Sequence, residues 1–217
     1  MELGLRFYST ALRLTADSAP LWYNLALCYH SCSRLADDGG AAGGERVEAE
    51  RRWALAAVKK AVALQPTEAS YWNLLGLVAP RPAVAQHAFI RAVELQPASA
   101  EAWTNLGAVY YECGDRRLAH QCFARAQNAD PFYVPAWIGQ ANIAQQLSPA
   151  EAMDLFRHTV AIGSGRPTEC EGALSYAHWV LDTLADPQVF LPYIFHFLFF
   201  SFLFSLSPCP GPWVNLI

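Results

Sequence analysis

The chain has 217 residues, which is enough for one or two domains. Hydrophobic residues make up 53% of the sequence and charged residues 16%, so a core forms easily and wholesale disorder is excluded. The net charge is −4 and no long basic run occurs, which argues against direct nucleic-acid binding. The six cysteines are scattered without a Cys-x2-Cys pair, and no signal-peptide pattern is recognisable. We therefore expect free thiols in a reducing compartment.

The first predicted element is a helix over residues 2–14. Tyr8 and Ala11 lie three residues apart in it, and the same spacing recurs at Phe123 and Ala126 in a later helix. Residues 2–14 therefore match the second helix of a helix pair whose first helix is missing. We expect the chain to begin in the middle of a repeat.

A longer helix pair is predicted next. Trp22 opens its first helix, over residues 20–31, because apolar or small residues follow at the +3, +4 and +7 positions. The Ala-, Asp- and Gly-rich segment 36–45 predicts a flexible inserted loop. The second helix of this pair is expected from near Glu45 to about Leu64.

The third unit is shorter than its neighbours. Its first helix is predicted over residues 69–79. Trp72 and Trp103 are 31 residues apart, whereas Trp103 and Trp137 are 34 apart. The missing residues fall at 79–82, where two prolines force a tight break. We expect the first helix of this unit to end early.

The most regular unit lies next along the chain. Its first helix reads Trp103-x2-Leu106-Gly107-x2-Tyr110, its second reads Ala119-x3-Phe123-x2-Ala126, and Pro131 ends it. These spacings place the named residues on one face of each helix. Gly114 suits a left-handed residue after the first helix, and Asp115 suits the cap of the second.

This pattern resembles that of the tetratricopeptide family, in which one repeat is a helix–turn–helix unit. A single unit cannot bury its apolar face, so it requires stacked neighbours. We predict an all-α fold: a right-handed tetratricopeptide-repeat solenoid of antiparallel helix pairs over residues 1–162, with the loop 36–45 inserted.

The pattern weakens after the regular unit. A first helix is predicted over residues 135–146, although Gln140 stands where leucine is usual. Ser148 suits the cap of the next helix because Pro149 follows it. Residues 163–186 are expected to form a linker and one extra helix, around 172–184.

A hydrophobic, non-repeat tail is predicted over residues 187–217. Its segment 189–206 has 18 residues without Asp, Glu, Lys or Arg, which is barely long enough to span a membrane. One interpretation is a tail anchor. The other, which we favour, is translated non-coding or alternative-exon sequence, because Phe, Leu, Ser and Pro are typical of pyrimidine-rich codons.

No catalytic motif of the P-loop, nucleophile-elbow, zinc-protease or dinucleotide-binding type occurs. The nearest approach to a metal cluster is Cys28-x-His30-x-Cys32. Residues at i, i+2 and i+4 of a helix do not share one face, so we interpret these cysteines as packing residues. We predict no catalytic, cofactor-binding or metal-binding residues, no cofactor and no enzymatic activity.

An interaction surface is the remaining prediction. The series Trp22, Trp72, Trp103 and Trp137 recurs once per unit, which favours a role in the core between helices. In a helix-pair superhelix the first helices line the concave side. We expect those helices to be residues 20–31, 69–79, 100–112 and 135–146. No Lys or Arg occurs in any of these four ranges.

Tetratricopeptide domains that clamp a partner's terminal carboxylate use cations together with asparagines on the concave side. This chain keeps Asn24 and Asn105 but lacks the cations, so chaperone-tail clamping is not expected. The neutral to acidic, aromatic concave face, with Tyr23, Tyr111 and Glu112, suits a protein segment better than RNA.

Several stretches over residues 1 to about 185 also resemble, more narrowly, the tetratricopeptide scaffold subunits of superkiller (Ski) complexes. The stretches are Leu21–Tyr23, Tyr71–Gly76, Ala85–Ile90, Ala102–Gly107, Trp137–Ala141, Met153–Thr159 and Glu171–Trp179. The stretches Trp137–Ala141 and Met153–Thr159 are not repeat consensus, so they are the more specific. The tail matches nothing in these subunits.

The resemblance implies a non-catalytic protein-interaction scaffold. It would hold an RNA helicase and WD40-propeller subunits and would support exosome-mediated 3′-to-5′ decay of messenger RNA. It implies a cytoplasmic location, with a nuclear one left open, and no direct nucleic-acid binding. The alternative is a tail-anchored membrane tetratricopeptide adaptor or co-chaperone, with a membrane contact only through residues 189–206.

Overall fold

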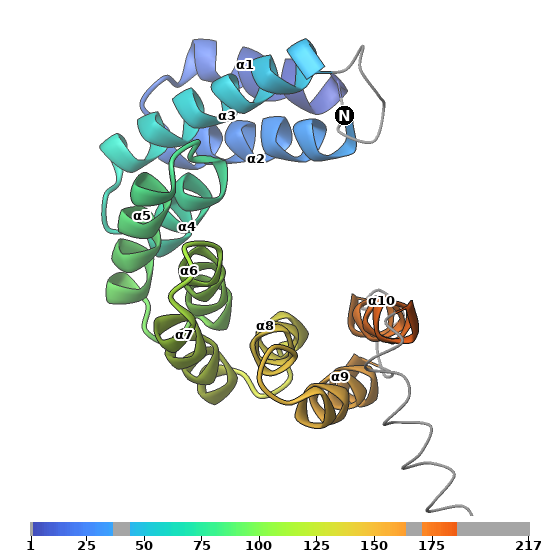
Figure 1. The fold of residues 1–217 in the computed structure, drawn as a ribbon. Coiled ribbons are helices and arrows are strands. Elements are labelled where there is room, and N and C mark those ends of the chain that lie inside the picture. The colour runs from blue at the N-terminus through green and yellow to red at the C-terminus, as the bar shows by residue number, and fades with distance from the viewer. Residues whose placement is uncertain (1, 37–43, 164–170, 186–217) are drawn as a thin grey trace, which may run out of the picture.

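The computed structural model describes residues 2–36, 44–163 and 171–185. Within these ranges it contains ten α-helices and no strand (Figure 1). The helices are α1 (Glu2–Leu14), α2 (Ala19–Ala36), α3 (Gly44–Leu64), α4 (Ala69–Val78), α5 (Pro82–Leu95), α6 (Ala100–Glu112), α7 (Arg116–Ala129), α8 (Val134–Ala144), α9 (Pro149–Gly163) and α10 (Glu171–Ala185).

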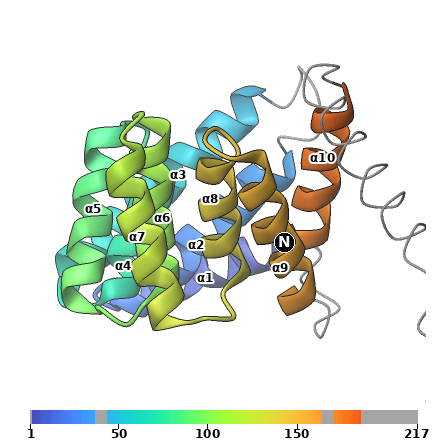
Figure 2. The ribbon, with the colours of Figure 1, turned by 60° about the horizontal axis from the view of Figure 1, so that its bottom comes forward.

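The helices stack as antiparallel pairs along a curved arc. The pairs are α2–α3, α4–α5, α6–α7 and α8–α9, and each pair packs on the next. Figure 2 shows the helices from α5 to α9 standing side by side with their axes roughly aligned. Stacking of this kind gives each pair the neighbour that buries its apolar face, as predicted for a solenoid.

The helices at the two ends of the described array continue the same alternation. α1 packs on α2 as α3 packs on α4, which is the position predicted for a second helix. α10 packs on both α9 and α8, as α8 packs on both α7 and α6. α10 therefore occupies the place of a first helix, so it extends the stack rather than standing apart from it.

The α6–α7 pair has the local structure that its sequence predicts. Gly114 has a φ of +84°, in the left-handed region that favours glycine. The Asp115 side chain accepts a hydrogen bond of 3.0 Å from the Leu118 backbone N–H and so caps α7. An added Cβ at Gly107 would lie 2.8 Å from the Phe123 ring, so this glycine is required for the close approach of the two helices.

The tryptophan series is only half-buried, which corrects the expectation of a simple core role. Each indole N–H donates to the backbone carbonyl six residues earlier: Trp22 to Ala16, Trp72 to Pro66, Trp103 to Pro97 and Trp137 to Pro131, at 2.7–2.8 Å. The rings of Trp22, Trp72 and Trp103 pack against the core, and the polar end of each of the four rings fixes the turn before its helix.

The early end of the third unit is confirmed: α4 stops at Val78, and α5 starts at Pro82. The inserted loop falls mostly between Ala36 and Gly44, and the tail over 187–217; both lie outside the described residues. None of the described helices is long and apolar enough to cross a membrane. The division of the chain at residues 162 and 186 remains a prediction.

Candidate interaction surface

The concave side of the arc is built from the first helices of the pairs. Figure 1 shows α2, α4, α6 and α8 on the inner side and α5, α7 and α9 on the outer side. As predicted, α4, α6 and α8 contain no Lys or Arg. The prediction was wrong for α2, because this helix continues past residue 31 to Ala36 and carries Arg34 in its last turn.

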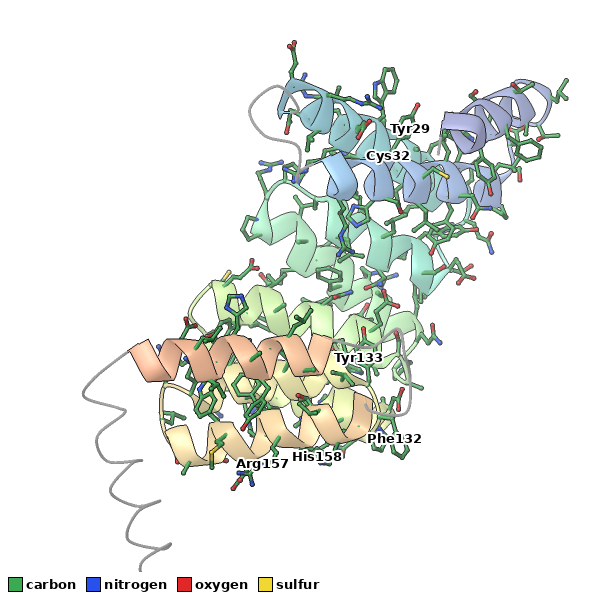
Figure 3. All side chains as sticks on the ribbon, turned by 90° about the vertical axis from the view of Figure 1, so that its right-hand side faces the viewer. Tyr29, Cys32, Phe132, Tyr133, Arg157 and His158 are labelled. Atoms are coloured by element: carbon green, nitrogen blue, oxygen red, sulfur yellow. The ribbon has the colours of Figure 1, made fainter. Side chains whose placement is uncertain are left out.

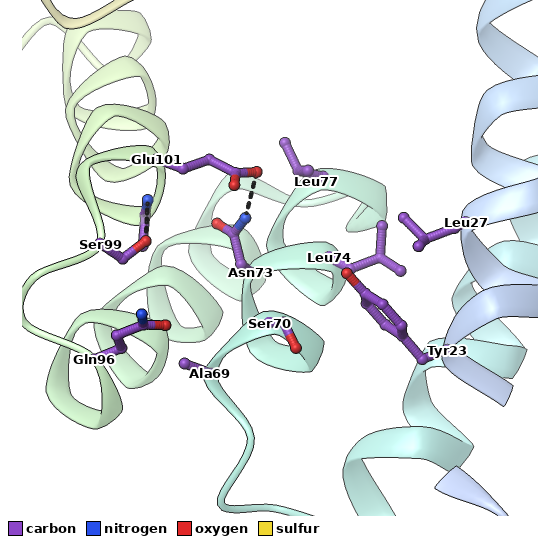
Figure 4. Close-up of a pocket in the computed structure, with 11 residues that line it drawn as sticks. Tyr23, Leu27, Ala69, Ser70, Asn73, Leu74, Leu77, Gln96, Ser99 and Glu101 are labelled. Atoms are coloured by element: carbon purple, nitrogen blue, oxygen red, sulfur yellow. Dashed lines mark hydrogen bonds between the residues drawn. The ribbon is translucent and has the colours of Figure 1, made fainter. Parts of the chain in front are cut away.

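Two asparagines on the concave side form hydrogen bonds with neighbouring side chains of the chain itself. Asn105 donates its side-chain N–H to Asn73 Oδ1 at 2.9 Å, and Asn73 donates to Glu101 Oε1 at 2.8 Å. Figure 4 shows the contact between Asn73 and Glu101. The Glu101 carboxylate would repel the terminal carboxylate of a partner. The geometry therefore does not favour chaperone-tail clamping.

One cavity, of about 120 Å³, lies between α2, α4 and the start of α6. Its apolar wall includes Leu27 and Leu77, and its polar wall includes Tyr23 and Glu101 (Figure 4). The Tyr23 ring packs on Tyr71 with 4.9 Å between ring centroids. Burial, and then the negative charge of Glu101, raises the pKa of Tyr23, so its hydroxyl stays protonated and can donate a hydrogen bond.

A larger cavity, of about 390 Å³, lies beside the end of α4. Its lining is His30, Ser33 and Arg34 from α2, Glu48, Arg51, Arg52 and Leu55 from α3, and Leu77, Val78, Ala79 and Pro80 from the end of α4 and the turn after it. Burial, and then the charges of Arg34 and Arg51, lowers the pKa of His30, so this ring is neutral at pH 7. The cavity therefore owes its positive charge to arginines alone.

Residues 28–32, the nearest approach to a metal cluster in the sequence, lie on α2. No group of His, Cys, Asp or Glu suited to a metal ion occurs in the part of the chain that the structure describes. Figure 3 shows Tyr29 and Cys32 on α2, where Tyr29 stacks on the exposed Trp53 of α3 at 6.5 Å. His30 instead lines the larger cavity.

The residues that depart from the repeat consensus make contacts between neighbouring pairs. An added Cβ at Gly139 in α8 would lie 2.5 Å from the Phe123 ring in α7. Gln140, which replaces the usual leucine, is buried and contacts His120 Nδ1 of α7 at 2.8 Å. Contacts with the preceding pair therefore constrain which residues can stand between Trp137 and Ala141.

A second contact of this kind joins α9 to α10. An added Cβ at Gly172 would lie 2.8 Å from the backbone oxygen of Thr159, which is fully buried. The Thr159 hydroxyl lies 2.6 Å from the carbonyl of Phe156 and 3.4 Å from that of Gly172. Within the α8–α9 pair, His158 of α9, labelled in Figure 3, packs edge-on against Trp137 of α8, with 4.5 Å between ring centroids.

Comparisons with known proteins agree with this architecture. No protein-family model matches the chain. Solved structures share the fold: a tetratricopeptide protein of Thermus thermophilus (TM-score 0.61, 17% identity, 82% of this chain and 89% of that one) and MamA (TM-score 0.58, 20% identity, 75% and 88%). At these identities they show the fold alone. The chain thus has the fold of a tetratricopeptide-repeat solenoid.

The sequence comparisons are more specific. The chain is 43% identical over 192 residues to human "Superkiller complex protein 3" and 40% identical over 191 residues to the mouse protein of that name. It is 39% identical over 198 residues to "Tetratricopeptide repeat protein 37" of Xenopus laevis. Each match covers 86% of this chain and 12% of the relative, so the chain spans only a short part of the length of these relatives. The predicted resemblance to the tetratricopeptide scaffold subunit of the superkiller complex is confirmed.

Proposed function

We propose that this chain is a non-catalytic scaffold segment of a superkiller-type complex that supports exosome-mediated 3′-to-5′ decay of cytoplasmic messenger RNA. The observation that carries the proposal is the contact of Gly139 with Phe123. It lies in one of the non-consensus stretches that resemble the superkiller subunit, and it sets how two pairs stack. A stretch that fixes the relative position of repeats fixes the shape that partners recognise.

The partners that follow from this proposal are an RNA helicase and WD40-propeller subunits. The chain would bind them through many contacts of modest strength along rigid stacked helices. Direct RNA binding is not proposed, because Glu101 lies on the concave side and α4, α6 and α8 supply no cation there. A membrane contact would require residues 189–206, which lie outside the described residues.

Affinity purification with mass spectrometry tests the proposal. Residues 1–186 and the full chain are each used as bait, and we expect the helicase and propeller subunits with both. A matched variant is Gly139→Val, which should lower recovery because it shifts the stacking of α8 on α7. Gly44→Ala is its control, since nothing lies within 4 Å of a Cβ at Gly44. Recovery of chaperones or membrane receptors alone would contradict the proposal.

A further inference from the structure

A third cavity, of about 190 Å³, lies where the α6–α7 pair meets the α8–α9 pair. Its lining includes His120 and Gln127 of α7, Gln140 and Ala144 of α8, and Glu151 of α9. Figure 1 shows α7 and α9 on the outer side of the arc and α8 on the inner side. The cavity therefore lies between two outer helices, on the side of α8 away from the concave surface. We call it the α7–α9 cavity.

A small residue in α8 stands where the regular unit has an aromatic ring. Tyr110 lies seven residues after Trp103, and Ala144 lies seven residues after Trp137. The Tyr110 ring packs against two core clusters, and its hydroxyl accepts a hydrogen bond of 3.3 Å from Gln86 Nε2. Ala144 carries only a methyl group, so α8 supplies no ring at the corresponding place beside α7.

Two amide side chains line the α7–α9 cavity at positions that are apolar in the preceding unit. Gln127 of α7 has the repeat position of Val93 in α5, and Gln140 of α8 has that of Leu106 in α6. Val93 and Leu106 are buried in one core cluster, where α5 meets α6. The amides give up this apolar packing and place polar groups next to a cavity, which is unfavourable unless they find hydrogen-bond partners.

Both amides have N–H groups to offer to a ligand. Gln140 Oε1 lies 2.8 Å from His120 Nδ1, so this oxygen accepts from the ring and the Gln140 N–H groups are left to donate elsewhere. Gln127 Nε2 is buried and has no hydrogen-bond partner within the described residues. A buried donor without an acceptor is costly, so a ligand that brings an oxygen atom to Gln127 recovers a lost interaction.

The charge beside the α7–α9 cavity is negative. Glu151, in the first turn of α9, lines the cavity and forms no ion pair with another described residue. The described part of the lining contains no Lys or Arg. A basic group next to the occupant would therefore be attracted by Glu151, whereas a phosphate group would be repelled.

We propose that the α7–α9 cavity binds a tyrosine side chain of a partner protein, next to a Lys or Arg residue in that partner. The tyrosine ring takes the place that Tyr110 fills in the preceding unit, and its hydroxyl accepts a hydrogen bond from the amide of Gln127 or Gln140. The neighbouring basic side chain pairs with Glu151. The site adds an outer contact surface to the proposed scaffold role, on which its biological meaning rests.

Fluorescence anisotropy with the full chain tests the proposal. The probes are two labelled six-residue peptides, Gly-Ser-Tyr-Arg-Ser-Gly and Gly-Ser-Arg-Tyr-Ser-Gly, because the chain direction of the partner is not fixed by the cavity. We expect one of them to bind. Exchange of its Tyr for Ser should weaken binding at least tenfold, since the buried ring is lost, and exchange of its Arg for Glu should weaken binding at least threefold.

Substitutions that restore the pattern of the regular unit separate binding from folding. Ala144→Tyr should fill the cavity with a ring of the chain itself, and the double variant Gln127→Val, Gln140→Leu should remove both amides. The double variant should keep or raise the melting temperature, and each change should weaken peptide binding at least tenfold. The control is Gln121→Val with Gln145→Leu, which changes exposed glutamines of α7 and the end of α8 outside the cavity lining.

Charge reversal tests the pairing with Glu151. Glu151→Lys should reverse the preference of the chain, so that the peptide with Glu beside Tyr binds more tightly than the peptide with Arg. Glu112→Lys is the control, because Glu112 is an exposed residue of α6 outside the cavity lining. It should leave the preference unchanged.

No binding of either peptide, or equal binding of the Tyr and Ser peptides, would overturn the proposal. So would undiminished binding by the Gln127→Val, Gln140→Leu variant, or sedimentation data in which the peptide separates a dimer, because the cavity would then hold a second copy of this chain. The assay does not require the complex. Peptide binding without recovery of the helicase contradicts the proposed function alone, and the reverse result contradicts the cavity proposal alone.

Discussion

The α6–α7 pair and the α2–α3 pair use the same repeat pattern but differ in what they leave exposed. In α6–α7 the helices have 13 and 14 residues, and the neighbouring pairs are of similar length. In α2–α3 they have 18 and 21 residues, and the next first helix has only 10. The regular pair is covered on both sides. The long pair extends past its neighbour, and residues of α2 and α3 line the larger cavity beside the end of α4.

The comparison teaches that pattern and length control different things. Apolar residues at helical spacing set the packing within a pair and make each pair alike. The surface open to a partner depends on how far one pair extends past the next. The larger cavity therefore lies at the irregular unit rather than at the regular one. Four predictions test this difference between the two pairs.

The largest effect is expected from Phe123→Ala in the regular region. The Phe123 ring is 2% exposed and fills the space against Gly107 and Gly139, so its loss should lower the free energy of unfolding by about 3–5 kcal/mol. Urea denaturation measures this. Phe132→Ala is the control, because Phe132 is 65% exposed at the turn before α8 (Figure 3) and should change the value by less than about 0.5 kcal/mol. Equal effects would contradict the assigned core.

Gly139→Val tests the contact between pairs. The added side chain meets the Phe123 ring and should destabilise the array by about 1–3 kcal/mol through overpacking. The same urea series measures it. Phe123→Leu should recover part of the loss in the double variant, since it removes the atoms that clash. Additive losses would show that the two residues do not touch.

Trp103→Phe tests the tryptophan contact with the turn. A smaller aromatic ring remains, but the N–H donor to the Pro97 carbonyl is lost, so the expected loss is at least about 1 kcal/mol. Trp53→Phe in the long pair is the matched change, because Trp53 is 61% exposed. The melting temperature of the Trp53→Phe variant should equal that of the unsubstituted chain. A larger effect at Trp53 than at Trp103 would reverse the comparison of the two pairs.

The smallest effect is one of reactivity and not of stability. Burial raises the pKa of Cys122 in α7 to about 11, whereas Cys113 is exposed at the end of α6. At pH 8 only about one in a thousand Cys122 side chains is then a thiolate, the nucleophilic form. Iodoacetamide labelling followed by peptide mass spectrometry should find Cys113 modified before Cys122. Equal labelling of the folded chain would contradict the burial of Cys122.

Much of the fold was predictable because the signals were local. Gly114 and Asp115 mark the turn between α6 and α7 by their own backbone and hydrogen-bonding preferences. The repeated Trp spacing predicted the helix pairs and also located the short unit. The core role expected for the Trp series was only half correct, since spacing reports which face a residue lies on but not where its polar N–H finds an acceptor.

The candidate site was less predictable. The sequence places Glu112 and Tyr23 on the concave side, but its pattern indicates an end of the first helix of the long pair at residue 31. Arg34, which continues the helical face of Tyr23 and Leu27, lies beyond that expected end. A count of the apolar positions up to the Gly-rich segment would have extended that helix, because no stop signal precedes the segment.

The sequence by itself determined the all-α repeat class, the order of the helix pairs and the likeness to a superkiller-complex subunit, because helical spacing and turn residues act over a few positions. The stacking of the helices was needed to see that Gly139 leaves room for the Phe123 ring of the preceding pair, and that Arg34 of α2 and Pro80 after α4 line one cavity. The physical reason is that these relations join residues of different pairs. They depend on the helix lengths and stacking of two units at once, which no single stretch of sequence contains.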